Sequence, residues 1–224
     1  MARLPTPADH AKQKRLPAPP TALRTWWFMD ILISLIGFSL ATFMTPGPNN
    51  IMLLSSGARF GFQPTIPHIL GVALGFAVMA TIVGLGLAQV FVTHPEIHDA
   101  VKWVAAAYLL YLAWRISGAG GAHGGDGRGR PLTFLEAALF QWMNPKGWTI
   151  ALSVIPLYMT RDGDPYFEIA RIALVFLFVG LGSASTWAAF GKAISRLVAK
   201  PRAARIFNIA MALLLVASIV PILF

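Results

Sequence analysis

Two short runs of residues interrupt apolar stretches of the chain, and they hold most of the groups that could do chemistry. Both runs combine proline with asparagine, and they read Pro46-Gly47-Pro48-Asn49-Asn50 and Asn144-Pro145-Lys146. Proline removes a backbone donor and clashes with the preceding helical turn, and glycine adds backbone freedom. Each run therefore predicts the interruption of a helix. Corresponding interruptions in two halves of a membrane protein point to a substrate site near the midplane.

Lys146 is the only basic residue deep inside a hydrophobic segment. A charge inside a membrane is costly, so such a residue usually faces a cavity or a partner. Lys146 could hold an anionic group of a substrate, or it could lose its proton when dehydrated and so act in a coupling step. The alternative is a structural role, in which Lys146 binds the free carbonyls of its own break or extends to the interface.

The polar neighbours of these prolines also have two interpretations. Asn49, Asn50 and Asn144 offer donors and acceptors without a full buried charge, but they could simply cap the broken helices. Glu136 is a second candidate for coupling, although it precedes Lys146 by about 15 Å along a continuous helix. That separation is too long for a direct pair, and Glu136 could instead mark the membrane interface.

Several kinds of chemistry are excluded by the residue types. The chain has no cysteine, which excludes disulfides, cysteine zinc sites and thiol relays. His94, His98 and His123 have no metal-ligand spacing. We find no Walker phosphate loop and no triad pattern, so ATP-driven transport by this chain alone is not expected. We expect no metal, no cofactor and no enzyme activity.

The elements that position these residues are predicted from hydrophobicity. Of the 224 residues, 56% are hydrophobic and only 12% are charged, whereas soluble domains carry about 25% charge. The net charge is +9, but the basic residues lie between apolar blocks, which favours a membrane rather than nucleic acid. A membrane-spanning helix needs about 20 apolar residues. Six hydrophobic segments follow, at roughly 31–57, 66–92, 100–117, 133–158, 168–190 and 203–223.

We therefore expect an all-α polytopic membrane protein of about six transmembrane helices, with the first and fourth helices broken. Backbone groups left unpaired in lipid are costly, so each break must face protein or a water-filled cavity. Each break opens a group of three segments, and three crossings reverse the orientation. The two halves would then form an inverted repeat. Chance similarity between apolar segments is the alternative.

Sequence identity between the halves agrees with a repeat. The matched pairs are Pro46 with Pro145, Leu40 with Leu139, Met44 with Met143, Ile51 with Ile150 and Leu53 with Leu152. We expect a single membrane domain at 29–224. It would consist of a first repeat at 29–117, a flexible glycine-rich loop at 118–131 and a second repeat at 132–224.

Residues 1–28 differ in composition from the remainder of the chain. Their proline and lysine content predicts a disordered tail. A second methionine, Met29, runs straight into the first hydrophobic segment. Translation could start there, in which case residues 1–28 are not part of the protein; a genuine cytoplasmic tail is the alternative.

Glycine and histidine outside the two runs predict packing rather than binding. We expect close approach of helices at Gly71, Gly75, Gly84 and Gly86, and at Gly180 with Gly182. His68 could titrate near neutral pH. A lone histidine at a membrane edge is, however, more often structural.

The motifs together carry a resemblance to a known family. They are Pro46-Gly47-Pro48-Asn49, the turn Gly57-Ala58-Arg59-Phe60-Gly61, Gly71 with Gly75, and Asn144-Pro145-Lys146. In order and spacing, over about residues 29–224, the chain resembles the LysE/RhtB family of bacterial exporters of amino acids and related metabolites. Some relatives have a carboxylate in or near these motifs. This chain has asparagine there, which argues against a proton relay through acids at those positions.

The resemblance implies a secondary exporter that moves a small amino acid or related metabolite out of the cell. It implies a multi-pass protein of the bacterial inner membrane, driven by the proton motive force. Free N–H groups of the helix that restarts after Pro48 would bind a carboxylate, and free carbonyls would bind an ammonium. The expected partners are the solute and the lipid bilayer, without nucleic acid. The oligomeric state is left open, a homo-oligomer included.

Other functions compete with export of an amino acid. An exporter of another small solute or ion is the nearest alternative, but hard cations need carboxylate oxygens, which the segments nearly lack. A membrane-embedded enzyme would need more intramembrane ionisable groups. An assembly subunit has no need for open backbone groups in broken helices.

The orientation depends on where the chain begins. Loops after the first, third and fifth segments contain nine cations, namely Arg59, Arg115, Arg128, Arg130, Lys192, Arg196, Lys200, Arg202 and Arg205. Loops after the second and fourth contain three, namely Lys102, Arg161 and Arg171. The positive-inside rule then places the nine in the cytoplasm and both ends outside, if the chain starts at Met29. The basic residues of the 1–28 tail favour the opposite orientation, and when they are counted the orientation is open.

Overall fold

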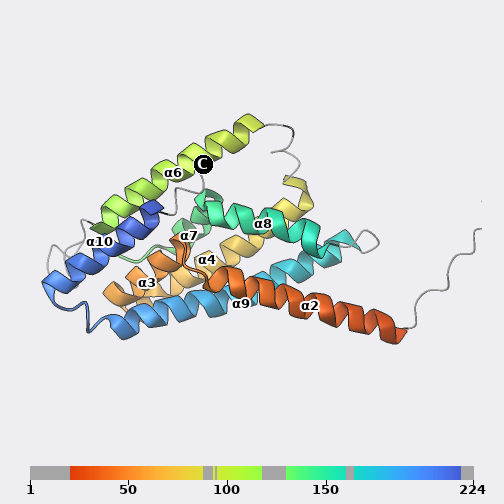
Figure 1. Ribbon diagram of the computed structural model, residues 1–224, viewed down its shortest axis with the longest axis horizontal. Helices are drawn as coiled ribbons and strands as arrows, with labels where there is room; N and C mark the ends of the chain where they lie inside the picture. Colours follow the sequence, from red (N-terminus) through yellow and green to blue (C-terminus); the bar gives the residue numbers. More distant parts are fainter. Residues whose placement is uncertain (1–20, 88–92, 94, 118–129, 160–163, 218–224) are drawn as a thin grey trace, which may run out of the picture. The chain divides into compact units, whose positions relative to one another are not determined.

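The computed structural model describes residues 21–87, 93, 95–117, 130–159 and 164–217. Figure 1 shows its helices, which are α2 (Thr21–Met44), α3 (Pro48–Phe60), α4 (Phe62–Ile82), the π-helical turn η1 (Val83–Leu87), α6 (Pro95–Ser117), α7 (Phe134–Phe140), the 3-10 turn η2 (Gln141–Met143), α8 (Pro145–Tyr158), α9 (Pro165–Ile194) and α10 (Pro201–Ala217). No strand occurs among the described residues. The all-α prediction is confirmed.

Each predicted hydrophobic segment coincides with a helix or a broken pair of helices, as far as the described residues reach. Phe62–Gly86 and Pro165–Ile194 are each long and apolar enough to cross a membrane. The bent pair Met29–Met44 and Pro48–Phe60 makes a third candidate if it counts as one span. The other described helices do not reach this length and apolarity by themselves. The six-helix arrangement and its inverted repeat therefore stay predictions.

The chain divides into two compact units, residues 1–34 and residues 35–224. The first unit contains the start of α2 at Thr21, so residues 21–28 are helical rather than disordered as the sequence predicts. Residues 1–20 lie outside the described part, as does the glycine-rich loop except for its last two residues. Both helix breaks belong to the second unit, to which the following description applies.

Helix α9 is the central packing element of the second unit. It packs against α3 and α4, while α10 packs against α6 (Figure 1). A Cβ atom added at Gly57 would collide with the carbonyl oxygen of Ala188, and one at Gly191 with that of Leu54. The backbones of α3 and α9 therefore touch at two reciprocal points. This contact holds α3, and with it the first break, in a fixed position.

Helix α4 approaches α7 in a similar way. A Cβ at Gly75 would lie 2.6 Å from Ala138 Cα, and one at Gly71 would collide with the carbonyl oxygen of Phe134. The predicted close approach is confirmed at these two glycines. It is wrong for Gly86 and Gly182, where an added Cβ would meet nothing within 4 Å. Gly86 instead has a φ of 125°, a conformation that favours glycine.

An aromatic cluster fixes the end of α2. Phe43 lies edge-on to Phe76 of α4 and Phe176 of α9, with ring centroids 5.3 and 5.1 Å apart, and Phe76 stacks on Phe176 at 5.3 Å. Each such pair contributes about 0.5–1.5 kcal/mol beyond its buried area. The last turn of α2, just before the first break, is thus held against two other helices.

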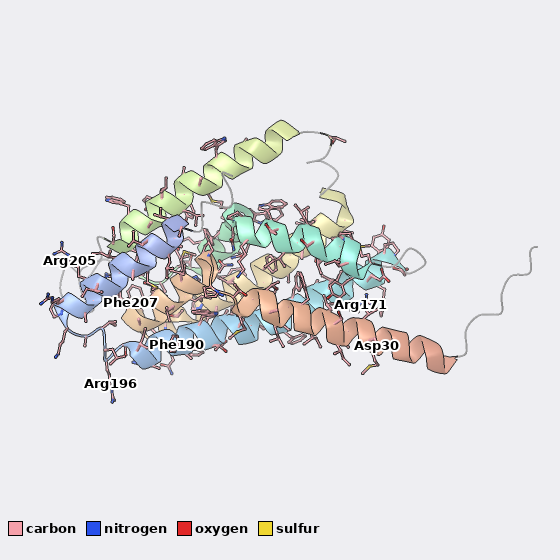
Figure 2. The ribbon with its side chains drawn as sticks, in the orientation of Figure 1. Asp30, Arg171, Phe190, Arg196, Arg205 and Phe207 are labelled. Atoms are coloured by element: carbon pink, nitrogen blue, oxygen red, sulfur yellow. The ribbon has the colours of Figure 1, made fainter. Side chains whose placement is uncertain are left out.

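One residue assigned to a loop by the sequence is buried in a helix. Arg171 is 9% exposed on α9, inside a candidate membrane span, and its guanidinium donates to the carbonyl oxygen of Tyr158 at 2.9 Å. Figure 2 shows it on α9, far from Arg196 beyond the other end of that helix. Arg171 is therefore not a loop cation in the orientation count.

Candidate functional site at two helix breaks

The first break separates α2 from α3 and bends them by 61°. Gly47 is the residue before α3, in extended conformation, and Pro48 occupies the first helical position. Proline suits that position because its missing N–H would have had no helical partner. No side chain caps α3, so the N–H groups of its first turn have no capping acceptor.

The second break separates the turn η2 from α8. Asn144 is extended there, with φ −93° and ψ 106°, and Pro145 is the first residue of α8. The Asn144 side chain makes no capping hydrogen bond. Both predicted interruptions are thus present. The helix starts pair Pro48 with Pro145, which shifts the register by two residues from the match of Pro46 with Pro145.

The two breaks contact each other directly. The Lys146 Nζ atom donates to the carbonyl oxygen of Thr45 at 2.5 Å. Asn49 Nδ2 donates to Gln141 Oε1 at 2.7 Å, and Gln141 Nε2 donates back to Asn49 Oδ1 at 3.2 Å. A Cβ at Gly47 would lie 2.8 Å from Lys146 Cδ, so the lysine stem lies against the glycine backbone. Residues about a hundred positions apart in the chain therefore form one cluster.

Side chains occupy the carbonyl groups that α2 leaves open at its end. Asn50 Nδ2 donates to the carbonyl oxygens of Phe43 and Thr45, at 2.7 and 2.8 Å. Ser183 Oγ of α9 donates to the same Phe43 oxygen at 2.9 Å. With Lys146 on Thr45, these bonds give the Phe43 and Thr45 carbonyl oxygens hydrogen-bond partners at the end of α2. The uncapped N–H groups are those at the starts of α3 and α8.

A pocket lies beside these contacts, with an empty volume of about 500 Å³ counting its open mouth. Six of the eight predicted binding residues line it, namely Gly47, Pro48, Asn49, Asn50, Asn144 and Lys146. Pro46 and Pro145 do not line it and act on the backbone instead. The remaining lining is mostly apolar, from Val72 and Phe76 of α4 and Ile150 of α8. The structure thus brings most of the predicted residues to one cavity.

The pocket favours a negative charge at one side. The starts of α3 and α8 and the Lys146 ammonium border it, and none of the lining residues, all within the described chain, has a carboxylate. Asn144 Oδ1 is buried and has no hydrogen-bond partner among the described residues. A buried acceptor without a partner is unfavourable by about 1–3 kcal/mol, so it is available to a donor that enters the pocket.

Glu136 lies outside the lining of this pocket, in the first turn of α7. Its carboxylate accepts two hydrogen bonds from Arg130, at 2.6 and 2.7 Å, and one from the Thr133 backbone at 2.8 Å. Thr133 and Glu136 form a capping box at the start of α7. The carboxylate is partly exposed, and its role in coupling stays a prediction.

Sequence reasoning missed two polar residues of the cluster. Gln141 is fully buried and pairs with Asn49, and Ser183 binds the end of α2. Gln141 could have been noticed as an amide inside an apolar segment, five residues before Lys146. Ser183 had no such signal, because small hydroxyl residues are common in packed helices. No cluster of potential metal ligands occurs in the described residues.

Comparisons with known proteins show the family of the chain. The sequence model described as LysE type translocator matches residues 40–219, and the chain belongs to this family. The cysteine/O-acetylserine efflux protein of Escherichia coli (strain K12) is 28% identical over 198 residues, covering 88% of this chain and 95% of the relative. Its counterpart in Salmonella typhimurium (strain LT2) is 30% identical over 179 residues, covering 80% and 90%. No solved structure matches the chain.

Membership in a translocator family, together with the apolar helices, defines a multi-pass helical membrane protein of a transporter family. The matched relatives are bacterial, which fits the bacterial inner membrane. The two breaks and their pocket lie inside the matched range.

Proposed function

We propose that this chain exports a small neutral amino acid of the cysteine and O-acetylserine type from the bacterial cytoplasm. The observation that carries the proposal is one pocket bordered by Lys146 Nζ, by two uncapped helix starts and by the unpartnered Asn144 Oδ1. The names of the efflux relatives support the choice of substrate.

The carboxylate of the substrate binds at the positive side of the pocket. Backbone N–H groups of the first turns of α3 and α8 donate to it, as helix starts do for anions. The Lys146 ammonium has three donors. One donor reaches the Thr45 carbonyl, which leaves two for the carboxylate. Lys146 can therefore bind substrate without giving up its contact with the other break.

Other residues that line the pocket match the rest of the substrate. Asn144 Oδ1, which has no partner in the described residues, accepts from the substrate ammonium. Val72, Phe76 and Ile150 give the pocket an apolar wall that suits a short uncharged side chain. A lysine or arginine side chain would bring a second cation beside Lys146 without a carboxylate to pair with. The pocket therefore selects against basic amino acids.

The exporter works as two inverted three-helix repeats that meet at the breaks. Asn49 and Lys146 each occupy the second position of a restarted helix, and each reaches back to the segment before the other break. This exchange supports a two-fold relation between the halves. The proton motive force drives export, with Lys146 and Glu136 as candidates for the coupling step.

Everted membrane vesicles test the proposal because the cytoplasmic face is then outside and export is measured as uptake. Uptake of radiolabelled L-cysteine is expected to be abolished in Lys146→Met and in Lys146→Arg, since a planar guanidinium does not replace a compact ammonium. Asn49→Ala should weaken uptake less, because the backbone donors remain. Lys192→Met, an exposed lysine on α9, serves as the matched control with normal uptake.

Protein levels in the membrane are matched by immunoblotting. Full uptake by Lys146→Met would remove Lys146 from the mechanism. Uptake of lysine or arginine in preference to cysteine by the unaltered protein would contradict the proposed substrate class.

A further inference from the structure

A second cavity lies along α3 and α4, beyond the pocket between the breaks. It has an empty volume of about 630 Å³ counting its open mouth, and it is also bordered by α6, α10 and the segment before α7. Its polar lining residues are Ser55, Ser56, Arg59, His68, Arg130 and Asn208. None of its lining residues, all of them described, has a carboxylate. Because Arg130 is paired with Glu136, Arg59 gives this partly polar cavity its positive charge.

His68 is the first sign that this cavity receives a ligand. Its side chain is 1% exposed, and neither ring nitrogen has a hydrogen-bond partner among the described residues. One nitrogen of a neutral imidazole must be a donor and the other an acceptor. Buried polar groups in proteins nearly always have a partner, from protein, water or ligand. The cavity that His68 lines is where such a partner has room.

Arg59 is the second sign. It lies at the end of α3, where its guanidinium stacks over the Phe60 ring at 5.1 Å. No salt bridge to Arg59 is formed within the described part of the chain, whereas Arg130 is paired with Glu136 at 2.6 Å. Arg59 is thus an oriented cation in the cavity wall whose charge is left for an incoming anion.

The second cavity continues toward the pocket along both helices. On α3, Asn49 lines the pocket and Ser55 lines the second cavity, about 9 Å further along the helix. On α4, Val72 lines the pocket and His68 the second cavity, about 6 Å apart along the helix. The two sites are therefore consecutive along the same pair of helices.

The second cavity also faces the basic end of the second unit. A smaller adjoining cavity shares Ser55, Arg59 and Asn208 with it and extends to Val198, beyond the end of α9. Figure 2 shows Arg196 and Arg205 at this end, beside the link between α9 and α10. Clustered cations raise the local concentration of anions and speed their arrival. A carboxylate from the basic side would meet this cavity first.

We propose that the second cavity is a first binding site for the carboxylate of the exported amino acid. We call it the outer site because it lies nearer the basic end of the second unit than the Lys146 pocket does. Arg59 anchors the carboxylate there, and His68 donates a hydrogen bond to it. The amino acid binds at this site first and then moves along α3 and α4 to the Lys146 pocket. The proposal rests on the proposed function, since it concerns the same substrate on the way to the same pocket.

Initial uptake rates in everted vesicles, measured over a range of L-cysteine concentrations, test the role of Arg59. Arg59→Gln is expected to raise KM about tenfold, the value of one charge-assisted hydrogen bond, while Vmax stays close to normal. Arg196→Gln removes one cation from the same end without touching either cavity, and its KM should change less than twofold. Equal KM values for the two variants would overturn the outer site, because each cation would then affect KM only through the overall electrostatic field of the basic end.

A binding measurement separates this proposal from the proposed function. The chain has no native cysteine, so Ser55→Cys places a single thiol in the wall of the outer site. In the Lys146→Met background, O-acetyl-L-serine should slow modification of this thiol by a methanethiosulfonate reagent several-fold, and Arg59→Gln should remove the protection. Absence of protection would overturn the outer site even if the unaltered protein exports cysteine. Protection without uptake by the unaltered protein would instead contradict the proposed function.

Discussion

The amide pair between Asn49 and Gln141 provides a direct test of coupling between the two helix breaks. The perturbations are Asn49→Ala, Gln141→Met and the double variant. Methionine keeps the length of glutamine but cannot make either hydrogen bond. The pair joins residues from different breaks, so its free energy measures how strongly one break stabilises the other.

The geometry sets the expected magnitude. The bond from Asn49 Nδ2 to Gln141 Oε1 is short at 2.7 Å, whereas the return bond is 3.2 Å and Gln141 Nε2 also donates to the Ala137 carbonyl at 2.8 Å. One strong bond therefore supplies most of the coupling. Polar pairs between membrane helices average about 0.6 kcal/mol and reach about 1.7. We expect an interaction free energy of about 1 kcal/mol, roughly a fivefold change in equilibrium.

Although glutamine is the larger side chain, we expect Asn49→Ala to destabilise the protein more than Gln141→Met does. Gln141 is fully buried, so Asn49→Ala leaves its Oε1 without a partner, which destabilises by about 1–2 kcal/mol. Asn49 is only partly buried beside the pocket, where water can replace Gln141. Gln141→Met should therefore destabilise less, by under about 1 kcal/mol.

The measurement is equilibrium unfolding of purified protein, titrated from a mild detergent into sodium dodecyl sulfate and followed by tryptophan fluorescence. Distant, independent sites add within about 0.3–0.5 kcal/mol. An interaction free energy below about 0.3 kcal/mol would refute the idea that this pair couples the two breaks. A larger loss in Gln141→Met than in Asn49→Ala would refute the assignment of the buried partner.

Two further predictions concern packing and orientation. Gly57→Val should destabilise the protein by more than about 3 kcal/mol or prevent its accumulation in the membrane, because the added Cβ collides with the Ala188 backbone. Gly182→Val is the control. Its Cβ would meet nothing within 4 Å, so this variant should accumulate normally, as measured by immunoblotting. With the basic end in the cytoplasm, a cysteine replacing exposed Ala199 should be shielded from an impermeant thiol reagent added to intact cells, and one replacing exposed Tyr166 should be labelled. The reverse labelling pattern would place the basic end outside.

The positions of both helix breaks could be predicted from sequence because their cause is local. A proline inside an apolar segment removes a donor and clashes with the turn before it, whatever surrounds it. The helices could also be located from sequence, because the hydrophobicity of a segment is likewise a local property. The partners across the breaks could not be predicted, because Asn49 with Gln141 and Lys146 with Thr45 depend on how distant helices pack. That packing is set by contacts such as Gly57 against α9, which a single sequence does not show.

The register predicted for the repeat differs from the register of the two helix starts. Matching Pro46 to Pro145 gives five identities, but the helices start at Pro48 and Pro145. A proline in an extended link and a proline at the first helical position obey different constraints. Only the latter fixes where free N–H groups begin. By helix position, Asn49 corresponds to Lys146, since both are the second residue of a helix that starts at a proline.

Lys146 shows why neither interpretation from sequence was complete. Sequence allowed a lysine that binds an anionic substrate, or one that binds the carbonyls of its own break. The structure shows Nζ bonded to Thr45, a carbonyl of the other break, while the residue also lines the pocket. An ammonium has donors for both tasks, and the fixed Thr45 carbonyl orients the remaining two. The bond to Thr45 therefore holds the Lys146 charge at the pocket wall, and a guanidinium, with its planar fork beside Gly47, would not have the same geometry.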